Sequence, residues 1–330
     1  MGAKLCILNI YSCFGLYVRI LLNEKGHCNV LAERVLSKNI YKRNDCVKKG
    51  ANMLEVKNLC KTYPTFQLKD VSFVLPEGEI VGFIGQNGAG KTTTLKCIMQ
   101  AVLPDSGTVE LDGLDVNHYK KGIKQSISFT TGAFEYFRHN KLWKIANVYS
   151  KFFDNWEESQ FENFCKLFKL DLQKRVSELS AGMKVKFALA LAMSHNATIF
   201  IFDEPTSGLD PVARDELLDV FQEIVQDGQK SILFSTHITS DLDKCADRIL
   251  FIHDGKILLN DEKDRLLEMH ALIKGGMDDL TDDLRNRCVA VKTNSLGFSA
   301  LIKRENLIEN NLVSEKPTLD DIMVFYSKEK

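Results

Sequence analysis

The sequence predicts an α/β fold that is built on a parallel β-sheet. Residues 80–84 are a short apolar run, followed by a glycine-rich segment and then by helical periodicity over residues 91–101, which gives the order strand, loop, helix. Two more short apolar runs, residues 198–202 and 231–235, each follow a stretch of helical periodicity. Because strands that are buried on both faces read as continuous apolar runs between helices, these patterns favour a parallel sheet.

Length and composition are those of a globular protein in a reducing compartment. The chain has 330 residues, 45% of them hydrophobic, so it can bury a substantial core in one large domain with appendages or in two modest domains. The formal charge is -1, so no overall basic excess attracts nucleic acid or anionic lipid, and no nucleic-acid partner is expected. The 9 cysteines are scattered without a Cys-x-x-Cys pair, and we interpret them as free thiols.

Residues 1–52 precede the recognisable domain. Residues 5–22 are largely apolar, but Arg19 interrupts them and no small-residue cleavage site follows, which disfavours a membrane anchor or a signal sequence. Residues 49–53, KGANM, can be encoded by a purine-rich stretch that resembles a ribosome-binding site before a start codon. We therefore expect residues 1–52 to be a non-native or disordered extension. Peptides from this segment in a mass spectrum of the native protein would contradict that hypothesis.

Local patterns predict further elements of the domain. Residues 54–56 and 70–75 alternate apolar and polar side chains, as half-buried strands do. A helical subdomain is predicted over residues 143–172, where apolar side chains recur at helical spacing. A hairpin over residues 248–260 closes the pattern.

The composition changes after about residue 270. Gly275, Gly276 and the acidic residues that follow them suggest a linker. We therefore expect a main domain over residues 53–270 and a C-terminal accessory region over residues 271–330, a small α+β appendage with a last helix at residues 319–326. A packing or dimerisation role is the expectation for this region, and a regulatory ligand site is the alternative.

Residues 85–92, GQNGAGKT, fit the P-loop pattern and lie between a buried strand and a helix. Glycines are needed there because the backbone wraps closely around phosphates, to which its N–H groups and the helix N-terminus donate. Lys91 is predicted to reach the β- and γ-phosphates, and the Thr92 hydroxyl to bind Mg²⁺. The predicted nucleotide-binding residues of this segment are Gly85, Asn87, Gly88, Ala89, Gly90, Lys91, Thr92 and Thr93.

A second element follows an apolar strand. Residues 199–204, IFIFDE, end in two carboxylates. Asp203 is predicted to hold the shell of Mg²⁺, and Glu204 to orient and deprotonate the attacking water. An acidic strand end alone is usually a solvated cap, but its pairing with the P-loop favours catalysis.

The class of nucleotide hydrolase depends on three further segments. Residues 179–183, LSAGM, open a helix with a Ser hydroxyl and a small residue that a γ-phosphate can approach. Residues 205–210, PTSGLD, follow the two carboxylates directly, and His237 closes the strand at residues 231–235. In this order and spacing, over about residues 53–260, the motifs resemble those of ABC transporter ATP-binding subunits.

The resemblance implies roles for individual residues. Ser180 and Gly182 occupy the signature motif, and Asp210 ends the D-loop. His237 matches the switch histidine, which contacts the γ-phosphate and the catalytic water, and Tyr63 lies where the family stacks an aromatic ring on adenine. With Lys91 and Glu204, His237 completes the predicted catalytic set; Thr92 and Asp203 are the predicted metal ligands, and ATP and Mg²⁺ the expected cofactors.

Within the family, the sequence is most similar to single-domain bacterial exporter subunits of the bacitracin and multidrug-resistance type. Residues 235–242, STHITSDL, and residues 317–322, PTLDDI, carry that similarity. It implies a P-loop NTPase fold with a RecA-like α/β core, an antiparallel β subdomain and a helical subdomain.

Two positions depart from the family pattern. Residues 130–134, TTGAF, lack the glutamine that commonly follows this strand, so that water or Glu135 would substitute, and Met183 replaces the usual last glutamine of the signature.

The resemblance also implies partners. Two such domains would sandwich two ATP molecules head to tail, as a homodimer or with a related chain. No run of 18 apolar residues follows Met53, so the membrane-spanning permease would be a separate subunit, and this chain a cytoplasmic protein on the inner face of the cell membrane. The alternative is a soluble ABC ATPase that serves translation, DNA maintenance or signalling. A P-loop kinase or GTPase is a third reading, which leaves the signature helix unexplained.

Overall fold

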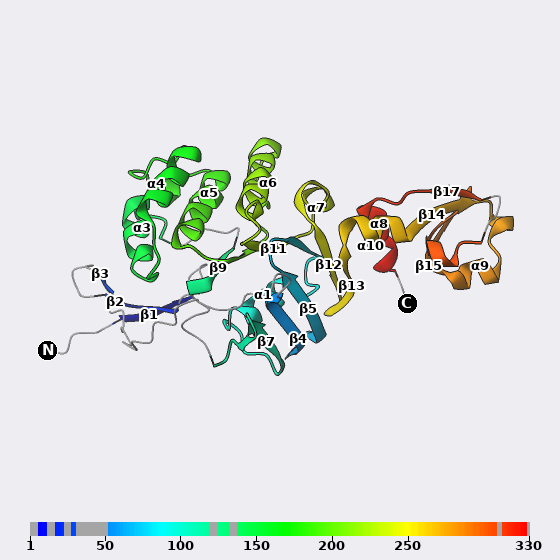
Figure 1. Ribbon diagram of the computed structural model, residues 1–330, viewed down its shortest axis with the longest axis horizontal. Coiled ribbons are helices and arrows are strands. Elements are labelled where there is room, and N and C mark those ends of the chain that lie inside the picture. The colour runs from blue at the N-terminus through cyan, green and yellow to red at the C-terminus, as the bar shows by residue number, and fades with distance from the viewer. Residues whose placement is uncertain are drawn as a thin grey trace.

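The computed structural model describes most of the chain and shows an α/β core flanked by smaller subdomains (Figure 1). The described residues are 6–11, 17–22, 28–30, 52–118, 125–131, 137–308 and 312–328.

The central sheet has six strands in the order β13-β12-β6-β11-β10-β9, and all of them run parallel except the edge strand β13. Every residue of β6, β10 and β11 is buried, which explains their continuous apolar pattern and confirms the predicted parallel sheet. The predicted hairpin at residues 248–260 is formed by β12 and β13. The strands are β6 (Ile80–Ile84), β9 (Ile127–Thr131), β10 (Ile199–Asp203), β11 (Ser231–Thr236), β12 (Arg248–His253) and β13 (Lys256–Glu262).

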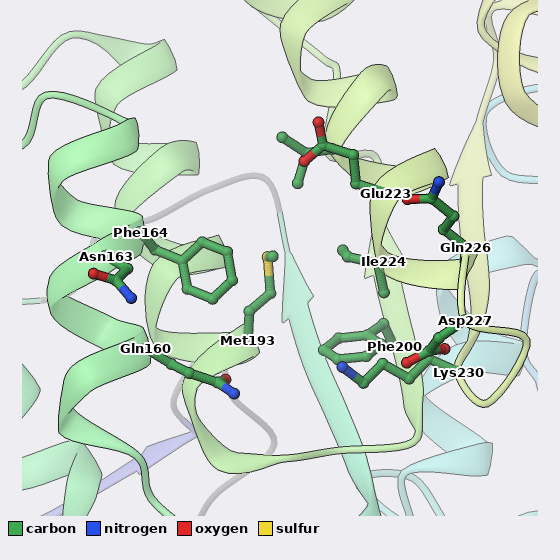
Figure 2. Close-up of a pocket in the computed structure, with 11 residues that line it drawn as sticks. Gln160, Asn163, Phe164, Met193, Phe200, Glu223, Ile224, Gln226, Asp227 and Lys230 are labelled. Atoms are coloured by element: carbon green, nitrogen blue, oxygen red, sulfur yellow. The ribbon is translucent and has the colours of Figure 1, made fainter.

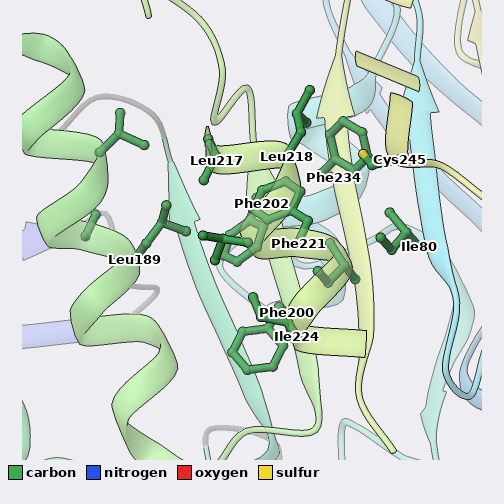
Figure 3. Packing of buried hydrophobic residues seen from close by; sticks show 14 of the residues in the cluster. Ile80, Leu189, Phe200, Phe202, Leu217, Leu218, Phe221, Ile224, Phe234 and Cys245 are labelled. Atoms are coloured by element: carbon green, nitrogen blue, oxygen red, sulfur yellow. The ribbon is translucent and has the colours of Figure 1, made fainter. Parts of the chain in front are cut away.

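The two faces of this sheet are covered by different elements, as Figure 1 shows. On one face, Phe202 stacks on Phe221 of α6 with ring centroids 4.9 Å apart, inside a cluster that also contains side chains of α5 and α7 (Figure 3). On the other face, Ile201 joins Leu95 of α1 and side chains of a second sheet. Successive side chains of β10 point alternately into the two clusters, one on each face of the sheet. Both clusters are apolar, which explains why β10 has no polar side chain before Asp203. These helices are α1 (Lys91–Ile98), α5 (Ala181–Ala192), α6 (Pro211–Val225) and α7 (Thr239–Cys245).

The second sheet is antiparallel, in the order β5-β4-β7-β8, and the helical subdomain lies at the other end of the core. Both confirm the predicted subdomains. The helical pattern over residues 143–172 corresponds to α3 and α4, with a turn between them. The elements are β4 (Asn52–Tyr63), β5 (Phe66–Pro76), β7 (Ser106–Leu111), β8 (Leu114–Asp115), α3 (Leu142–Ser150) and α4 (Glu158–Leu167).

The C-terminal region forms an antiparallel sheet in the order β15-β16-β14-β17, and its last helix, α10, matches the predicted bounds. The predicted linker at Gly275 is wrong, because this residue pairs with Phe298 at the end of β14. A Cβ at Gly275 would lie 2.8 Å from atoms of Phe298 and Leu312, so close packing explains the glycine. The elements are α8 (Lys263–Met269), β14 (His270–Gly275), α9 (Asp282–Arg287), β15 (Cys288–Asn294), β16 (Gly297–Lys303), β17 (Val313–Glu315) and α10 (Leu319–Tyr326).

The N-terminal segment contains a small antiparallel sheet of β1 (Cys6–Tyr11), β2 (Tyr17–Leu22) and β3 (Cys28–Val30). The rest of residues 1–51 lies outside the described residues, so the expectation of a non-native or disordered extension stays a prediction. Among the helices that the structure describes, none combines the length and the apolar character needed to cross a membrane.

Five cysteines between residues 60 and 288 are free thiols, which confirms the prediction for these positions. Burial raises the pKa of Cys97 to about 11 and those of Cys165 and Cys245 to about 12. These three thiols therefore stay protonated at neutral pH and are poor nucleophiles. The cysteines recorded as free thiols are Cys60, Cys97, Cys165, Cys245 and Cys288.

His195 makes the stability of the fold depend on pH. Its side chain is fully buried and stacks on Phe153 with ring centroids 3.8 Å apart, and burial lowers its pKa from 6.5 to about 4. Because the unfolded chain takes up this proton near pH 6.5 and the folded chain only near pH 4, the stabilisation is complete above pH 6.5 and is lost as the pH falls through that window. At about pH 5 we expect His195 to have lowered the free energy of unfolding by about 2 kcal/mol.

Urea unfolding at several pH values measures this effect. His195→Leu should remove that part of the pH dependence, because leucine has no proton to bind. His118→Leu is the matched control, since the side chain of His118 is 88% exposed and its loss should leave the slope intact. An equal pH dependence in His195→Leu and the unmodified protein would contradict the prediction.

Candidate active site

Strand order brings the predicted site segments together. β6, β11 and β10 are parallel neighbours, so their carboxyl ends meet at one edge of the sheet. The P-loop follows β6, Glu204 follows β10, and His237 follows β11. The P-loop, Glu204 and His237 are far apart in the sequence, but the order of the strands places them in one site.

The P-loop has the conformation that its glycines permit. Gly88 and Gly90 have φ angles of 84° and 117°. A Cβ at Gly90 would lie 2.6 Å from Cδ2 of Leu68 and 2.9 Å from Cζ of Phe66, while one at Gly85 would lie 2.4 Å from the carbonyl oxygen of Ile252. The loop therefore has no room for side chains at residues 85 and 90, and it leads directly into the N-terminus of α1.

Lys91, Glu204 and His237 form one charged cluster. The Lys91 ammonium donates to the carbonyl oxygen of Gly85 at 2.6 Å and lies 3.2 Å from Oε1 of Glu204. Oε2 of the same carboxylate lies 2.8 Å from Nδ1 of His237. The Lys91 side chain is only 5% exposed, so its charge acts in a partly desolvated environment. The three residues predicted to be catalytic are thus in contact.

Glu204 is held in an unusual backbone conformation. Its φ angle is 53°, in the left-handed region that residues other than glycine seldom adopt. Its N–H donates to the hydroxyl of Ser235 at 2.9 Å and to the carbonyl oxygen of Ser235 at 3.2 Å. These contacts from β11 compensate the backbone strain and direct the side chain toward Lys91 and His237.

Asp203 lies beside Thr92, as the sequence predicts. Oδ2 accepts from the Thr92 hydroxyl at 2.8 Å, and Oδ1 accepts from the Ser235 hydroxyl at 2.7 Å. A hydroxyl and a carboxylate side by side are the hard oxygen donors that Mg²⁺ takes together with water and phosphate oxygens. This pair therefore fits a magnesium ion.

Sequence reasoning missed Ser235, which contacts both acidic residues. The available signal was its position at the carboxyl end of the neighbouring strand.

A buried carboxylate ties the loops after β10 and β11 together. Asp241 is 1% exposed, and its Oδ2 accepts from the hydroxyls of Thr206 at 2.7 Å and Thr236 at 3.3 Å. The Thr236 hydroxyl in turn accepts from the N–H of Ile238 at 3.0 Å. This network, which the sequence analysis also missed, fixes the segment of Glu204 relative to that of His237.

Ser180 and Asp210 cap helices. The Ser180 hydroxyl accepts from the N–H of Met183 at 3.2 Å at the start of α5. Asp210 accepts from the N–H groups of Ala213 and Val212 at the start of α6, and these hydrogen bonds lower its pKa. Within the described part of one chain, no hydrogen bond or ion pair joins either residue to the P-loop.

The position of Gly182 has room for a side chain. A Cβ there would meet Leu209 at 3.5 Å and Ala213 at 3.8 Å, which are ordinary contacts. The fold of a single chain therefore does not require glycine at this position.

Tyr63 ends β4 at the tip of the β4–β5 hairpin, opposite Phe66 in the strand register. Its side chain is 38% exposed, and the Lys61 ammonium lies 6.0 Å from its ring centroid. Because Phe66 packs against Gly90, the hairpin tip lies next to the P-loop. Tyr63 thus presents an accessible ring near the predicted nucleotide site, and Phe66 is a neighbour that the sequence analysis missed.

The segment that lacks the usual glutamine, residues 130–134, begins at the end of β9, where Thr131 pairs with Asp203. Glu135 lies outside the described residues, so its role stays a prediction.

A separate cavity lies away from this cluster (Figure 2). Its volume is about 610 Å³, and α4 and α6 form its sides. Phe200 near the start of β10 and Lys230 before β11 line it, so it opens at the amino-terminal edge of the sheet, opposite to Asp203. It is not part of the predicted nucleotide site.

Comparisons with known proteins show which family the chain resembles. Residues 68–207 match the family model described as ABC transporter. The chain is 32% identical over 208 residues to the ABC transporter ATP-binding protein NatA of Bacillus subtilis, covering 61% of this chain and 84% of that protein. It is 30% identical over 224 residues to the bacitracin transport ATP-binding protein BcrA of Enterococcus faecalis, covering 66% and 71%.

A further relative and a solved structure point the same way. The glutamine transport ATP-binding protein GlnQ of Escherichia coli is 35% identical over 218 residues, covering 62% of this chain and 89% of that protein. A solved structure described as an ATP binding subunit of an ABC transporter superposes with a TM-score of 0.58 at 28% identity, covering 65% and 91%. The relatives and the solved structure are therefore all named as ATP-binding proteins or subunits of transporters.

Proposed function

The chain belongs to the family of ABC transporter ATP-binding proteins and is an ATPase, and from this premise we propose that it powers export through a separate permease subunit. The observation that carries the catalytic part is the contact of one carboxylate, that of Glu204, with both Lys91 and His237. A general base needs a partner that orients it and a cation close to the phosphate that is attacked. The cluster contains both.

Each residue of the cluster and its neighbours has a separate proposed role. Glu204 orients the attacking water and accepts its proton, and His237 holds the carboxylate at 2.8 Å. Lys91 and the N–H groups of the P-loop bind the β- and γ-phosphates. Thr92 and Asp203 would hold Mg²⁺, which neutralises charge on the phosphate oxygens when bound. Tyr63 stacks on adenine.

The proposed active unit contains two ATP-binding subunits, head to tail, as a homodimer or with a related chain. Ser180 supports this arrangement because it is exposed and caps its own helix, and among the described residues of its own chain no hydrogen bond joins it to the P-loop. Gly182 supports it as well, since its lack of a side chain is not needed for packing within the chain. Both features suit an N-terminus of α5 that approaches the γ-phosphate bound by another subunit.

Export is the proposed direction of transport. Relatives named for bacitracin transport and for glutamine transport are both similar to the chain, so overall identity does not decide between directions. The proposal of export is supported by residues 235–242 and 317–322, which resemble the corresponding segments of exporter subunits of the bacitracin-resistance type. Thr239 of the first segment and Asp320 of the second are hydrogen-bonded at 2.7 Å, so the two segments form one structural feature.

Copurification tests this proposal. The tagged full-length chain is extracted gently from native membranes, and an integral membrane protein in equal amount is the expected partner. Such a result would also support the proposed location on the inner face of the cell membrane. Recovery from the cytosol alone, with ribosomes, with DNA or without a partner, would instead support a soluble ABC ATPase.

A further inference from the structure

The last helix of the chain connects the C-terminal sheet to the core. Leu319, Ile322, Phe325 and Tyr326 of α10 are buried in the same cluster as Leu242 of α7. A capping box between Thr318 and Asp321 fixes the N-terminus of α10, with N–H to side-chain hydrogen bonds of 3.0 and 3.1 Å. The position of α10 against α7 is thus determined by apolar packing and by its own cap.

The first turn of α10 reaches the segment of the switch histidine. Oδ1 of Asp320 accepts from the hydroxyl of Thr239 at 2.7 Å. Thr239 begins α7 and lies two residues after His237, whose ring contacts Glu204 at 2.8 Å. At the other end of α7, the Lys263 ammonium donates to the carbonyl oxygen of Asp243 at 2.9 Å. Asp320 therefore holds the end of α7 that follows the histidine.

The opposite end of α10 is joined to the C-terminal sheet. Nε2 of His270, the first residue of β14, lies 2.9 Å from the hydroxyl of Tyr326, and Nδ1 lies 2.8 Å from the carbonyl oxygen of Leu266. Burial lowers the pKa of His270, so the neutral ring donates to Leu266 and accepts from Tyr326. A displacement of this sheet would therefore be transmitted to α10.

We propose that Asp320 is a positioning residue for ATP hydrolysis, which acts through Thr239 on the orientation of His237. The C-terminal region then sets the rate of hydrolysis and leaves ATP binding at the P-loop unaffected. This inference rests on the proposed role of His237. The hydrogen bond between Asp320 and Thr239 is exposed, so it contributes little to stability, and its removal spares the fold.

Steady-state ATP hydrolysis by the full-length chain, with its permease where one copurifies, tests the proposal. Asp320→Ala and Thr239→Val each lower kcat about threefold to tenfold with little change in the KM for ATP, a size typical of coupling through a packed network. Because both remove the same contact, the double variant is no slower than the slower single variant. Asp320→Asn and Thr239→Ser restore most of the rate, since each keeps its half of the hydrogen bond.

A matched control and a spectroscopic readout separate positioning from general damage. Glu315→Ala breaks the 2.6 Å contact with Lys274 in the same region, away from α7, and should leave kcat unchanged. In labelled protein, the ring resonances of His237 should shift in Asp320→Ala and Thr239→Val but not in Glu315→Ala. Melting temperatures of all variants should stay close to that of the unmodified protein.

Three outcomes would overturn the inference. Unchanged kcat in Asp320→Ala and Thr239→Val, while His237→Ala is inactive, would refute the positioning role alone. Additive losses in the double variant would show that the two residues act separately. Full activity in His237→Ala would refute the proposed catalytic role of His237, and the positioning role with it.

Discussion

Replacing Glu204 with glutamine is expected to lower the rate of ATP hydrolysis by about 10²- to 10⁴-fold while ATP still binds. The amide has the shape of the carboxylate but does not accept a proton from the attacking water. It also removes the ion pair with Lys91, whose ammonium lies 3.2 Å from Oε1, and so leaves that cation free for phosphate. ATP affinity should therefore be equal or higher. Because hydrolysis releases the proposed dimer, the variant should accumulate as an ATP-bound dimer.

Turnover, calorimetric ATP binding and light scattering measure the three parts of this prediction. Glu110→Gln is the matched control, because Glu110 also pairs with a lysine, Lys57 at 3.1 Å, on the antiparallel sheet away from the site. It should hydrolyse ATP normally. A native rate in Glu204→Gln would show that another group is the base.

Mixing two inactive variants should restore activity if each site contains residues of two chains. Lys91→Ala removes the phosphate-binding cation, and Ser180→Asp keeps a good helix cap while it places a carboxylate against the γ-phosphate. Each variant alone is expected to lose at least about 100-fold in rate. In a mixed dimer, one site combines both changes and the other has neither. Random pairing of equal amounts therefore restores about a quarter of the native rate.

The same ATPase assay on mixtures in varied proportion reports this complementation. Thr281→Asp makes an equivalent change at the cap of α9, where the Thr281 hydroxyl accepts from the N–H of Leu284 at 3.2 Å, and should leave the rate unchanged. If the mixture stays inactive while both variants still form dimers, the sites are complete within single chains.

Several site residues were predictable because their signals are local. Residues 85–92 carry the P-loop pattern within eight positions, and the φ angles of Gly88 and Gly90 explain why glycines stand there. Asp203 is the last residue of the apolar strand β10, and Glu204 follows it directly. Parallel strands place such ends at one edge, so the cluster of Lys91 and Glu204 was a direct consequence of the fold class.

Other contacts of the site were not predictable, because the sequence around a polar side chain does not indicate which distant residue it will bond. Ser235 bonds Asp203 across 32 positions of sequence, and Thr206 bonds Asp241 across 35. Strand order and helix packing decide these pairs. The prediction of a linker at Gly275 was wrong for a related reason. The sequence alone does not distinguish a glycine in a linker from a glycine that close packing against distant residues requires.

The sequence by itself predicted the parallel sheet, the P-loop and the two acidic residues at the end of an apolar run, because apolar periodicity and backbone demands act over a few residues. His237 was predicted from the order and spacing of the motifs and from the family resemblance that they carry. Only the tertiary structure decided how Glu204 lies between Lys91 and His237 and how Thr239 meets Asp320 across 81 positions. The physical reason is that these contacts depend on where whole elements pack. Burial of apolar faces sets those positions, and polar partners follow from them.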